Sequence, residues 1–533
     1  MKIKLMLLLP FSLLLVNCKL KGTNKDSFRD TTITQNTSFN NLFLDSSTVE
    51  SFFVDADSFK TYRSKFFQFY KQRNYEFAWF DANGITEQAH NFYNLQNNFA
   101  ANLNDSSIYN PQLQQLYEWL LNNNAPRNLI YDSVSRKAEM VFTGQFFKYA
   151  LKVYHGSDIN VKELGWFIPR KKINIIALLD TLVDGVSKPL SEYEPLNRQY
   201  RLLEAFVAKY YLLERKEKWD AIPDRKNYNE GESGIVITAI KKRLIAFGDL
   251  KTIDTSTLFD ASMVDALKRF QLRMGLKANG LLDTKTYKCL NIPIATLIKK
   301  MLINMERARW MPHDTSKVDR VVVNIPEFRL NVYDSGVYSF SMPVVVGTEA
   351  HNTVIFNDKI RYIVFSPYWN VPPSITKNEV IPRLKRNSNY LANHNMEVVR
   401  YTNGIPEVRQ KPGLNNALGR VKFLFPNKYS IYLHDTPGKD AFSKLNRSFS
   451  HGCIRIGDPK RMATFLLRNE PIYTTDSINA FMALTKEKWM DVKPPVQVII
   501  NYFTAWVDPF GQLNFREDIY GHDKRMAEKL FDK

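Results

Sequence analysis

The stretch VVVNIPEFRLNVYDSGVYSFSMPVVVG (residues 321–347) decides the fold class of the C-terminal part of the chain. Its β-branched and aromatic residues alternate with polar ones, and Asp334-Ser335-Gly336 marks a turn between two strands. The same period continues in RYIVFSPYWNVPP (361–373) and VKFLFPNKYSIYLHDTP (421–437). We therefore predict a mainly antiparallel β domain over residues 319–533. We expect PPVQVIINYFTAWVDPFGQLNFREDIYG (494–521) to add a hairpin that turns at 508–511.

Residues 374–420 interrupt the strand pattern with mixed, polar and partly helical sequence. An insertion of about 45 residues is longer than a connection between strands requires, so it is a cap or a disordered excursion. Its helical and apolar segments favour a cap.

The part of the chain before residue 319 has a helical period instead. Over residues 51–225, apolar residues recur three and four positions apart, as in AEMVFTGQFFKYALKVYHG (138–156), and no catalytic side chains are evident. We therefore expect a helical scaffold domain here. Its boundary is PDRKNYNEGESG (223–234), and a connecting helix over 294–318 leads into the β domain.

Residues 226–293 are predicted to form a small domain of three helices. Two apolar faces support the first two helices: Val236, Ile240 and Leu244 in one, and Met263, Ala266, Leu267 and Phe270 in the other. With MGLKANGLLDTKTYKCL (274–290), the order of elements resembles the small helical peptidoglycan-binding domain; a plain helical spacer is the alternative. Cys289 in the last helix is expected to be a small buried apolar residue.

Composition limits the class of protein. The chain has 533 residues, 44% of them hydrophobic, which predicts three or four folded units. The net charge of +19 suits an anionic partner such as nucleic acid, a membrane face or an acidic wall polymer, although solubility alone also explains it. Three cysteines, at 18, 289 and 453, exclude a dense disulfide framework.

The N-terminus MKIKLMLLLPFSLLLVNC (residues 1–18) has the features of a signal peptide. The end of its apolar run resembles a bacterial lipobox with Cys18 as the lipidated residue, although Asn17 departs from the usual small residue; an ordinary signal peptide is the alternative. Residues 19–50 are predicted to be a flexible tether. We expect a lipid-anchored protein on the periplasmic side of a bacterial cell envelope, and Lys19 favours the outer membrane.

The chemistry of the chain is concentrated in Ser450-His451-Gly452-Cys453-Ile454-Arg455 and in the upstream His434. A free thiol is only slightly ionised at neutral pH, and a nearby imidazole can take its proton. Gly452 lets the backbone come close to a bound carbonyl, and N–H groups around Gly452 and Cys453 can hold the developing oxyanion. Asp458-Pro459 directly after the motif predicts the start of a helix.

This constellation is very similar to that of the L,D-transpeptidases, bacterial enzymes that cross-link peptidoglycan through a cysteine. Fifteen residues lie between His434 and Ser450, within the range of the family signature. The likeness extends to NMERARWMP (304–312), YWNVPPSI (368–375) and PGLNNALGRVKFLFPN (412–427). It indicates the large Gram-negative branch, a multidomain α+β architecture with a helical scaffold, a peptidoglycan-binding domain and a capped, mainly β catalytic domain.

The resemblance implies roles for individual residues. Cys453 is the nucleophile, and His434 is the general base and acid. His451, the second candidate for the base, is expected to shape the site together with Ser450 and Gly452. Arg455 holds a peptide carboxylate or supports the loop, because a guanidinium serves either role. The expected pocket residues, for which core packing is the alternative, are Tyr432, Trp369 and Asn370.

The expected activity is L,D-transpeptidation of peptidoglycan, with stem peptides and glycan strands as partners and with carbapenems as acylating inhibitors. Scattered histidines and cysteines predict no metal, and the sequence has no phosphate-binding glycine loop, so no cofactor, nucleotide or nucleic acid is implied. One alternative is an L,D-carboxypeptidase or another cysteine hydrolase of wall peptides, although papain-like enzymes place cysteine before histidine. The other is a non-catalytic wall-binding lipoprotein. The acceptor, the oligomeric state and any partner proteins are not indicated.

Overall fold

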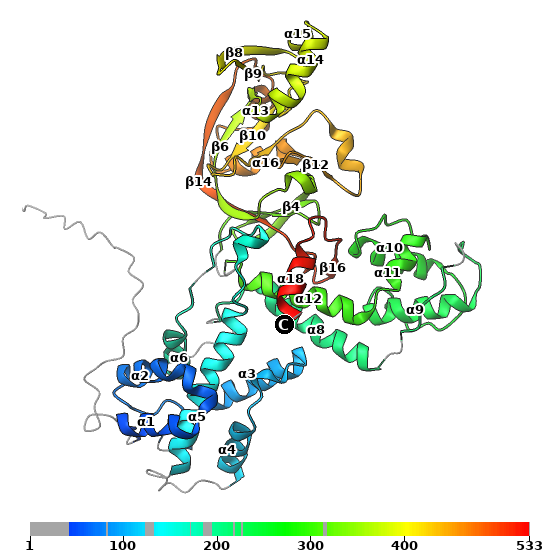
Figure 1. Cartoon of the computed structure of the whole chain (residues 1–533). Helices are drawn as coiled ribbons and strands as arrows, with labels where there is room; N and C mark the ends of the chain where they lie inside the picture. The colour runs from blue at the N-terminus through cyan, green and yellow to red at the C-terminus, as the bar shows by residue number, and fades with distance from the viewer. Residues whose placement is uncertain are drawn as a thin grey trace, which may run out of the picture. The chain divides into compact units, whose positions relative to one another are not determined.

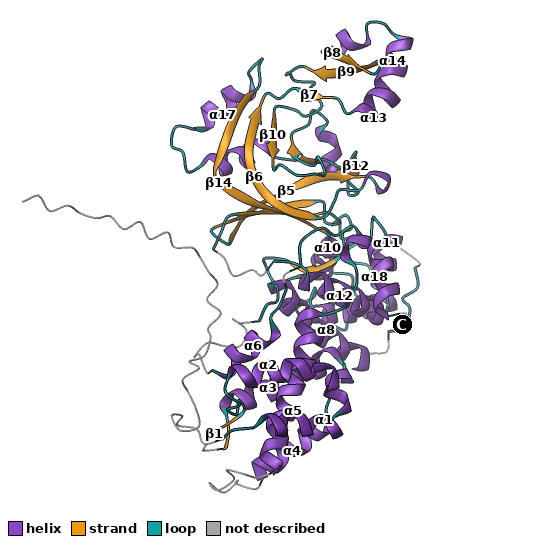
Figure 2. Ribbon diagram, turned by 60° about the vertical axis from the view of Figure 1, so that its left-hand side comes forward, coloured by secondary structure: helices purple, strands orange, loops and turns teal. Residues whose placement is uncertain are grey.

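The computed structural model describes residues 42–81, 84–122, 133–170, 172–184, 194–216, 219–224, 228–312 and 317–531 (Figures 1 and 2). The predicted signal peptide with Cys18, and most of the predicted tether, lie outside these residues. The described chain contains no helix that is both long and apolar enough to cross a bilayer. It divides into two compact units. The first contains residues 1–93, 110–147 and 174–190, and the second contains the remainder.

The first unit is largely helical. Its elements are α1 (Ser46–Asp55), η1 (Asp57–Tyr62), α2 (Arg63–Gln72), the two-residue strands β1 (Phe80–Asp81) and β2 (Gly84–Ile85), the start of α3 (Glu87–Leu103), α4 (Pro111–Asn122), most of α5 (Ser133–Ala150) and α6 (Ile175–Val183). The folded part of the chain begins before residue 50, the predicted end of the tether, because Leu42 and Leu44 are buried and α1 begins at residue 46. The predicted scaffold is helical, but it is shared between the two units.

Glu139 is a buried carboxylate at the centre of the first unit. It accepts hydrogen bonds from the N–H groups of Ala78 (2.7 Å) and Trp79 (2.9 Å) and from the Tyr70 hydroxyl (2.8 Å). Burial raises the pKa of Glu139 to about 7, against these hydrogen bonds, which lower it. A polar network that is satisfied in this way holds α2, α5 and the segment before β1 in one arrangement.

The remaining helical elements belong to the second unit. They are η2 (Ser106–Ile108), η4 (Leu151–His155), η5 (Val161–Leu164), α8 (Arg198–Lys216), α9 (Ile235–Phe247), α10 (Ala261–Arg273), α11 (Thr284–Leu290), α12 (Ile294–Arg309) and α18 (His522–Phe531). Helix α12 begins where the predicted connecting helix (294–318) does but ends at Arg309, and it packs on α8 and α18. Its Arg307 forms a buried ion pair of 2.6 Å with Asp523 of α18.

Helices α9, α10 and α11 form the predicted small helical domain. Asp260 and Asp283 cap α10 and α11 by accepting backbone N–H groups of the first turn, which explains why both helices begin where they do. The predicted face of α10 is buried as expected. In α9 the buried residue is Ile237 rather than Val236, and in α11 Cys289 is half-buried rather than part of the core.

A nine-stranded mixed sheet forms the core of the C-terminal part. Its order is β12-β5-β13-β11-β10-β6-β14-β3-β4, and β5 also pairs with β4, so the order returns on itself. Most neighbouring pairs are antiparallel, as predicted, whereas β11–β13, β12–β5 and β14–β3 are parallel. The strands are β3 (Arg320–Asn324), β4 (Arg329–Asp334), β5 (Val337–Gly347), β6 (Phe356–Phe365), β10 (Val421–Leu424), β11 (Leu433–His434), β12 (Ser448–Ser450), β13 (Ile454–Ile456) and β14 (Lys488–Asn501).

Short helices flank this sheet, namely η6 (Glu349–His351), η8 (Lys439–Ser443), α16 (Pro459–Leu467) and α17 (Thr475–Met482). Helix α16 begins as predicted, because Asp458 accepts the Arg461 N–H group and Pro459 occupies the first turn. The hairpin of β15 (Ala505–Val507) and β16 (Leu513–Phe515) forms where expected but makes a separate two-stranded sheet. The hairpin contacts helices α8, α10 and α12.

The segment between β6 and β10 folds into a small ordered subdomain, which we call the cap. It contains β7 (Trp369–Asn370), α13 (Pro373–Ile375), η7 (Thr376–Val380), α14 (Ile381–Arg386), α15 (Tyr390–Asn393), β8 (Met396–Thr402) and β9 (Ile405–Gln410). Its strands pair in the order β7-β9-β8, and Val371, Val380, Tyr390 and Val408 form its own core. In Figures 1 and 2 these elements lie together at one end of the β domain.

Candidate active site

Parallel pairing of β11 with β13 brings the predicted site residues together. His434 pairs with Arg455, and the Ile454 N–H group donates to the Tyr432 carbonyl (3.1 Å). Because paired residues in neighbouring strands point to the same side and residues two apart share a face, Tyr432, His434, Cys453 and Arg455 lie on one face of the sheet. The alternating Leu433 and Ile454 are fully buried on the other face.

His434 is buried and held by its own backbone. Its Nδ1 lies 2.5 Å from the Asp435 carbonyl, which can only accept, so Nδ1 carries the proton and Nε2 keeps the lone pair. Burial lowers the pKa of His434 to about 4, and the Asp435 hydrogen bond opposes this shift. The imidazole is therefore a neutral base at physiological pH.

Cys453 is half-buried directly before β13. Its Sγ lies 3.5 Å from the Ser430 carbonyl, and among the contacts of the described residues it makes no hydrogen bond with His434. Burial raises the pKa of the Cys453 thiol, while hydrogen bonds from the Tyr432 backbone and hydroxyl and the charge of Arg455 lower it. At rest the pair is thus a neutral thiol and a neutral imidazole.

The loop before Cys453 is fixed from both sides. Ser450 Oγ donates to the Cys453 carbonyl (2.6 Å) and accepts the Gly452 N–H group (3.1 Å). Thr353 Oγ1 donates to the Gly452 carbonyl (2.8 Å). The Gly452 N–H group is thereby occupied, which leaves that of Cys453 as the better donor to an oxyanion.

His451 lies on the exposed side of this loop and faces the cap. Its Nε2 is 3.8 Å from Glu379 Oε1 of η7, and its ring lies 5.1 Å from that of His351. These contacts place His451 between the loop before Cys453 and the cap, and its role in shaping the site stays a prediction.

Of the other predicted site residues, Arg455 lies on the same face as Cys453, whereas Trp369 and Asn370 belong to the cap. Arg455 is half-buried, its Nε has no partner among the described residues, and burial lowers the pKa of its guanidinium. Trp369 instead packs on the cap core, and Asn370 is exposed on the same strand. The structure records no contact of either with the residues around Cys453.

Sequence reasoning missed several residues that support the site. Asp435 follows the predicted histidine, and its carboxylate accepts the Arg420 N–H group (2.8 Å) and the Lys439 Nζ (2.6 Å). Its position directly after His434 is the only feature of the sequence that could have indicated this supporting role. Thr353, Ser430 and Glu379 are far from the motif in sequence, and nothing in the pattern singled them out.

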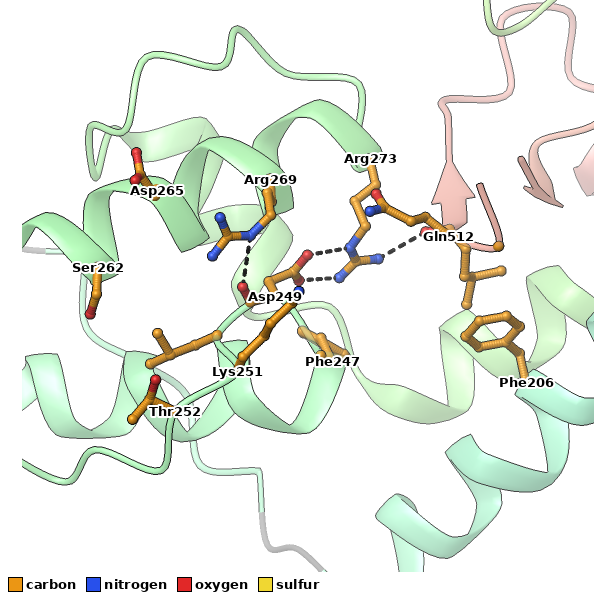
Figure 3. Close-up of a pocket in the computed structure, with 14 residues that line it drawn as sticks. Phe206, Phe247, Asp249, Lys251, Thr252, Ser262, Asp265, Arg269, Arg273 and Gln512 are labelled. Atoms are coloured by element: carbon orange, nitrogen blue, oxygen red, sulfur yellow. Dashed lines mark hydrogen bonds and ion pairs between the residues drawn. The ribbon is translucent and has the colours of Figure 1, made fainter. Parts of the chain in front are cut away.

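Two cavities lie elsewhere in the second unit. One of about 500 Å³ is lined by α10, the end of α9 and the β15–β16 turn, where Arg273 pairs with Asp249 (Figure 3). A larger one of about 900 Å³ is lined by residues from α11, α12 and the β3–β4 turn, among others. Neither lining includes a predicted site residue. No group of three metal-ligating side chains is found among the described residues.

Family models match three parts of the chain. An "L,D-transpeptidase catalytic domain" matches residues 318–474, a "Scaffold domain" matches residues 64–206, and a "Putative peptidoglycan binding domain" matches residues 233–290. The matches agree with the observed fold, in which helical regions precede a β-rich region that carries the Cys453 motif. Residues 318–474 are thus similar to the catalytic domain of the L,D-transpeptidases, and the two regions before them are similar to a scaffold domain and to a peptidoglycan-binding domain.

A curated relative from Haemophilus influenzae, named "Putative L,D-transpeptidase", is 29% identical over 248 residues, which is 44% of this chain and 50% of the relative. The match therefore spans half of that relative's length. Similar solved structures include L,D-transpeptidases from Mycobacterium smegmatis (13% identity, 35% of this chain, 59% of that chain, TM-score 0.19) and Stackebrandtia nassauensis (16%, 51%, 94%, 0.21). With such low TM-scores these structures add nothing to the assignment.

Proposed function

We propose that this protein is a cysteine-dependent L,D-transpeptidase that cross-links peptidoglycan stem peptides in the bacterial cell envelope. The observation that carries the proposal is the face that β11 and β13 share. On this face Cys453 lies opposite Tyr432, and the neutral His434 is the next residue of the same face along its strand. The family match of residues 318–474 supports the reaction class.

In the first half of the reaction, Nε2 of His434 accepts the Cys453 proton as Sγ attacks the carbonyl of the third residue of a donor tetrapeptide stem. A small movement of the thiol away from Ser430 is required, because Sγ starts on that carbonyl. The Cys453 N–H group stabilises the oxyanion. The terminal D-Ala leaves with the proton from His434, and a thioester remains.

In the second half, an amine from another stem attacks the thioester and forms the cross-link. The bond energy of the donor peptide is conserved in the thioester, so no external activation is required. Resolution by water would instead make the enzyme an L,D-carboxypeptidase. We further propose that Cys18 is lipidated and anchors the protein in the envelope, and that Arg455 binds a stem carboxylate.

The test is intact-protein mass spectrometry after exposure to a carbapenem, followed by analysis of muropeptides made from tetrapeptide stems. We expect one adduct and cross-linked dimers in the wild type and neither in Cys453→Ala. Cys289→Ala is the matched control, because it removes the other thiol of the described chain, whose pKa is raised by burial to about 11. An adduct that persists in Cys453→Ala would disprove the assignment, and D-Ala release without dimers would favour hydrolysis.

A further inference from the structure

The cavity of about 900 Å³ has walls from two domains of the family architecture. On one side lie α11 and the start of α12, and on the other the β3–β4 turn, residues 445–447 and residues 515–519. Its apolar lining includes Leu276, Ile292, Leu297, Phe328 and Ile519. Cavities of this size hold ligands of several hundred daltons, and none of this lining belongs to the site at Cys453.

The charged side chains of the cavity are strongly unbalanced. Seven basic and three acidic residues line it: Lys277, Lys285, Lys288, Lys300, Arg329, Arg447 and Arg516 against Asp283, Glu327 and Glu517. The chain as a whole has a smaller relative excess, 73 basic to 54 acidic residues. The cavity lining is therefore more strongly biased toward basic residues than the chain as a whole.

The cavity is lined by three arginines, and among the described residues only one of them has a carboxylate within ion-pair distance. Arg329 Nε lies 3.6 Å from Glu327 Oε1. The N–H groups of Arg447 instead donate to three backbone carbonyls, and Nη1 of Arg516 donates to two more. Carbonyls satisfy hydrogen bonds but do not neutralise a full positive charge, so two of the three guanidinium groups lack a carboxylate partner within ion-pair distance in the described chain.

The pKa shifts of Arg516 and Glu327 also reflect the excess of positive charge in the cavity. Burial lowers the pKa of Arg516 to about 10, and the charges of Arg329 and Arg447 act in the same direction, against that of Glu327. Burial also raises the pKa of Glu327, with Asp508 adding to the shift and Arg516 and Arg329 opposing it. An anion in the cavity would relieve the repulsion among the arginines.

We propose that this cavity binds a carboxylate-bearing stem peptide of the cell-wall polymer, as a second binding site distinct from the catalytic one. Guanidinium groups bind carboxylates through paired hydrogen bonds, and the apolar lining accommodates the methyl and methylene groups of a short peptide. One wall comes from the region that matches the peptidoglycan-binding model, which favours a wall peptide over other anions. The site would hold a strand while Cys453 acts on another stem.

The test measures binding to the full chain carrying Cys453→Ala, which cannot turn the ligand over. The probe is a soluble disaccharide tetrapeptide with free carboxylates, titrated calorimetrically and compared with the same molecule after amidation of its carboxylates. We expect Arg329→Gln combined with Lys288→Gln to weaken binding about tenfold or more, and amidation to have the same effect. Arg329→Lys, which keeps the charge but cannot form the paired hydrogen bonds, should weaken binding less than Arg329→Gln.

Arg361→Gln is the matched control, because Arg361 is exposed on β6 and does not line the cavity. Circular dichroism and a melting curve verify that each variant is folded; Lys288 is exposed, so Lys288→Gln alone provides a variant with little risk to the fold. Equal binding of the amidated ligand, or displacement of the peptide by millimolar inorganic phosphate, would overturn the proposal. Failure of carbapenem acylation in the wild type would contradict the transpeptidase proposal without affecting this result.

Discussion

At the scale of single residues, the site is defined by two groups that are both uncharged at rest. The low pKa of His434 comes from its burial, and the raised pKa of Cys453 has the same cause. A pre-formed thiolate–imidazolium pair would require the opposite shifts. In the proposed mechanism, proton transfer and nucleophilic attack are therefore coupled, and the His434 Nδ1–Asp435 carbonyl bond makes Nε2 the acceptor.

This arrangement predicts an unusual pH dependence of acylation. Protonated His434 cannot accept the thiol proton, so activity is lost as the pH falls through the folded pKa of about 4 rather than through the ordinary value of 6.5. The second-order rate constant of carbapenem acylation, measured from pH 4 to 9, should stay nearly level between pH 5.5 and 7.5. An acidic limb near 6.5 would show that the imidazole is solvated in the working enzyme.

The His434→Asn variant provides the matching control. Without a base, thiolate forms only by ionisation to solvent, so we expect the rate at pH 7 to fall by about 10²–10⁴-fold. The remaining rate should rise roughly tenfold per pH unit until the pH reaches the thiol pKa. A profile as flat as that of the wild type would assign the base to another group, for which His451 is the nearest candidate.

At the scale of elements, the turn between β12 and β13 determines where the nucleophile lies. Gly452 has φ +110°, a conformation that favours glycine, and a Cβ built there would meet nothing closer than 3.8 Å. Gly452→Ala therefore introduces backbone strain of about 1–3 kcal/mol rather than a collision. We expect it to slow acylation at least tenfold, because relaxation of the turn displaces Cys453.

Gly438→Ala is the control for this prediction. Gly438 also has room for a Cβ, with the nearest atom at 3.7 Å, but its φ of −79° is allowed for any residue. It should acylate at close to the wild-type rate and melt at the same temperature. If both variants acylate equally fast, the conformation of Gly452 does not position the thiol.

Elements with a clear local signal were predictable from the sequence. The β period of residues 321–347, the Asp caps of α10 and α11, and the Asp458-Pro459 helix start all appear in the structure, since each depends on neighbouring residues. The hairpin β15–β16 also forms where expected, but period alone does not say which elements a hairpin packs against. For the same reason the motif indicated Cys453 and His434, but not the distant Thr353 and Glu379 that hold its loop.

At the scale of the whole molecule, an arginine of a buried ion pair also hydrogen-bonds to a segment that is far away in sequence. Arg273 of α10 makes a two-pronged contact with Asp249 and donates its third N–H group to the carbonyl of Leu513 in β16 (3.0 Å), as Figure 3 shows in part. Arg273 and Asp249 are 5% and 4% exposed. The hydrogen bond to Leu513 thus connects the small helical domain, which contains the ion pair, to the C-terminal hairpin, and through α8 and α12 to the β domain.

Asp249→Asn should therefore destabilise both the small helical domain and the C-terminal hairpin, and not α10 alone. Removing the carboxylate leaves a buried guanidinium without a countercharge, which typically costs about 3–5 kcal/mol. Because a chain of several domains does not unfold in one step, the measurement is amide hydrogen exchange, and we expect protection to fall in both α10 and β16. Glu407→Gln, which breaks the exposed pair with Arg400, should leave the protection of both elements unchanged, because water screens this pair. The double variant Asp249→Leu with Arg273→Met should recover most of the protection, since it removes both charges. If Asp249→Asn lowers protection in α10 alone, the contact with Leu513 does not couple the two domains.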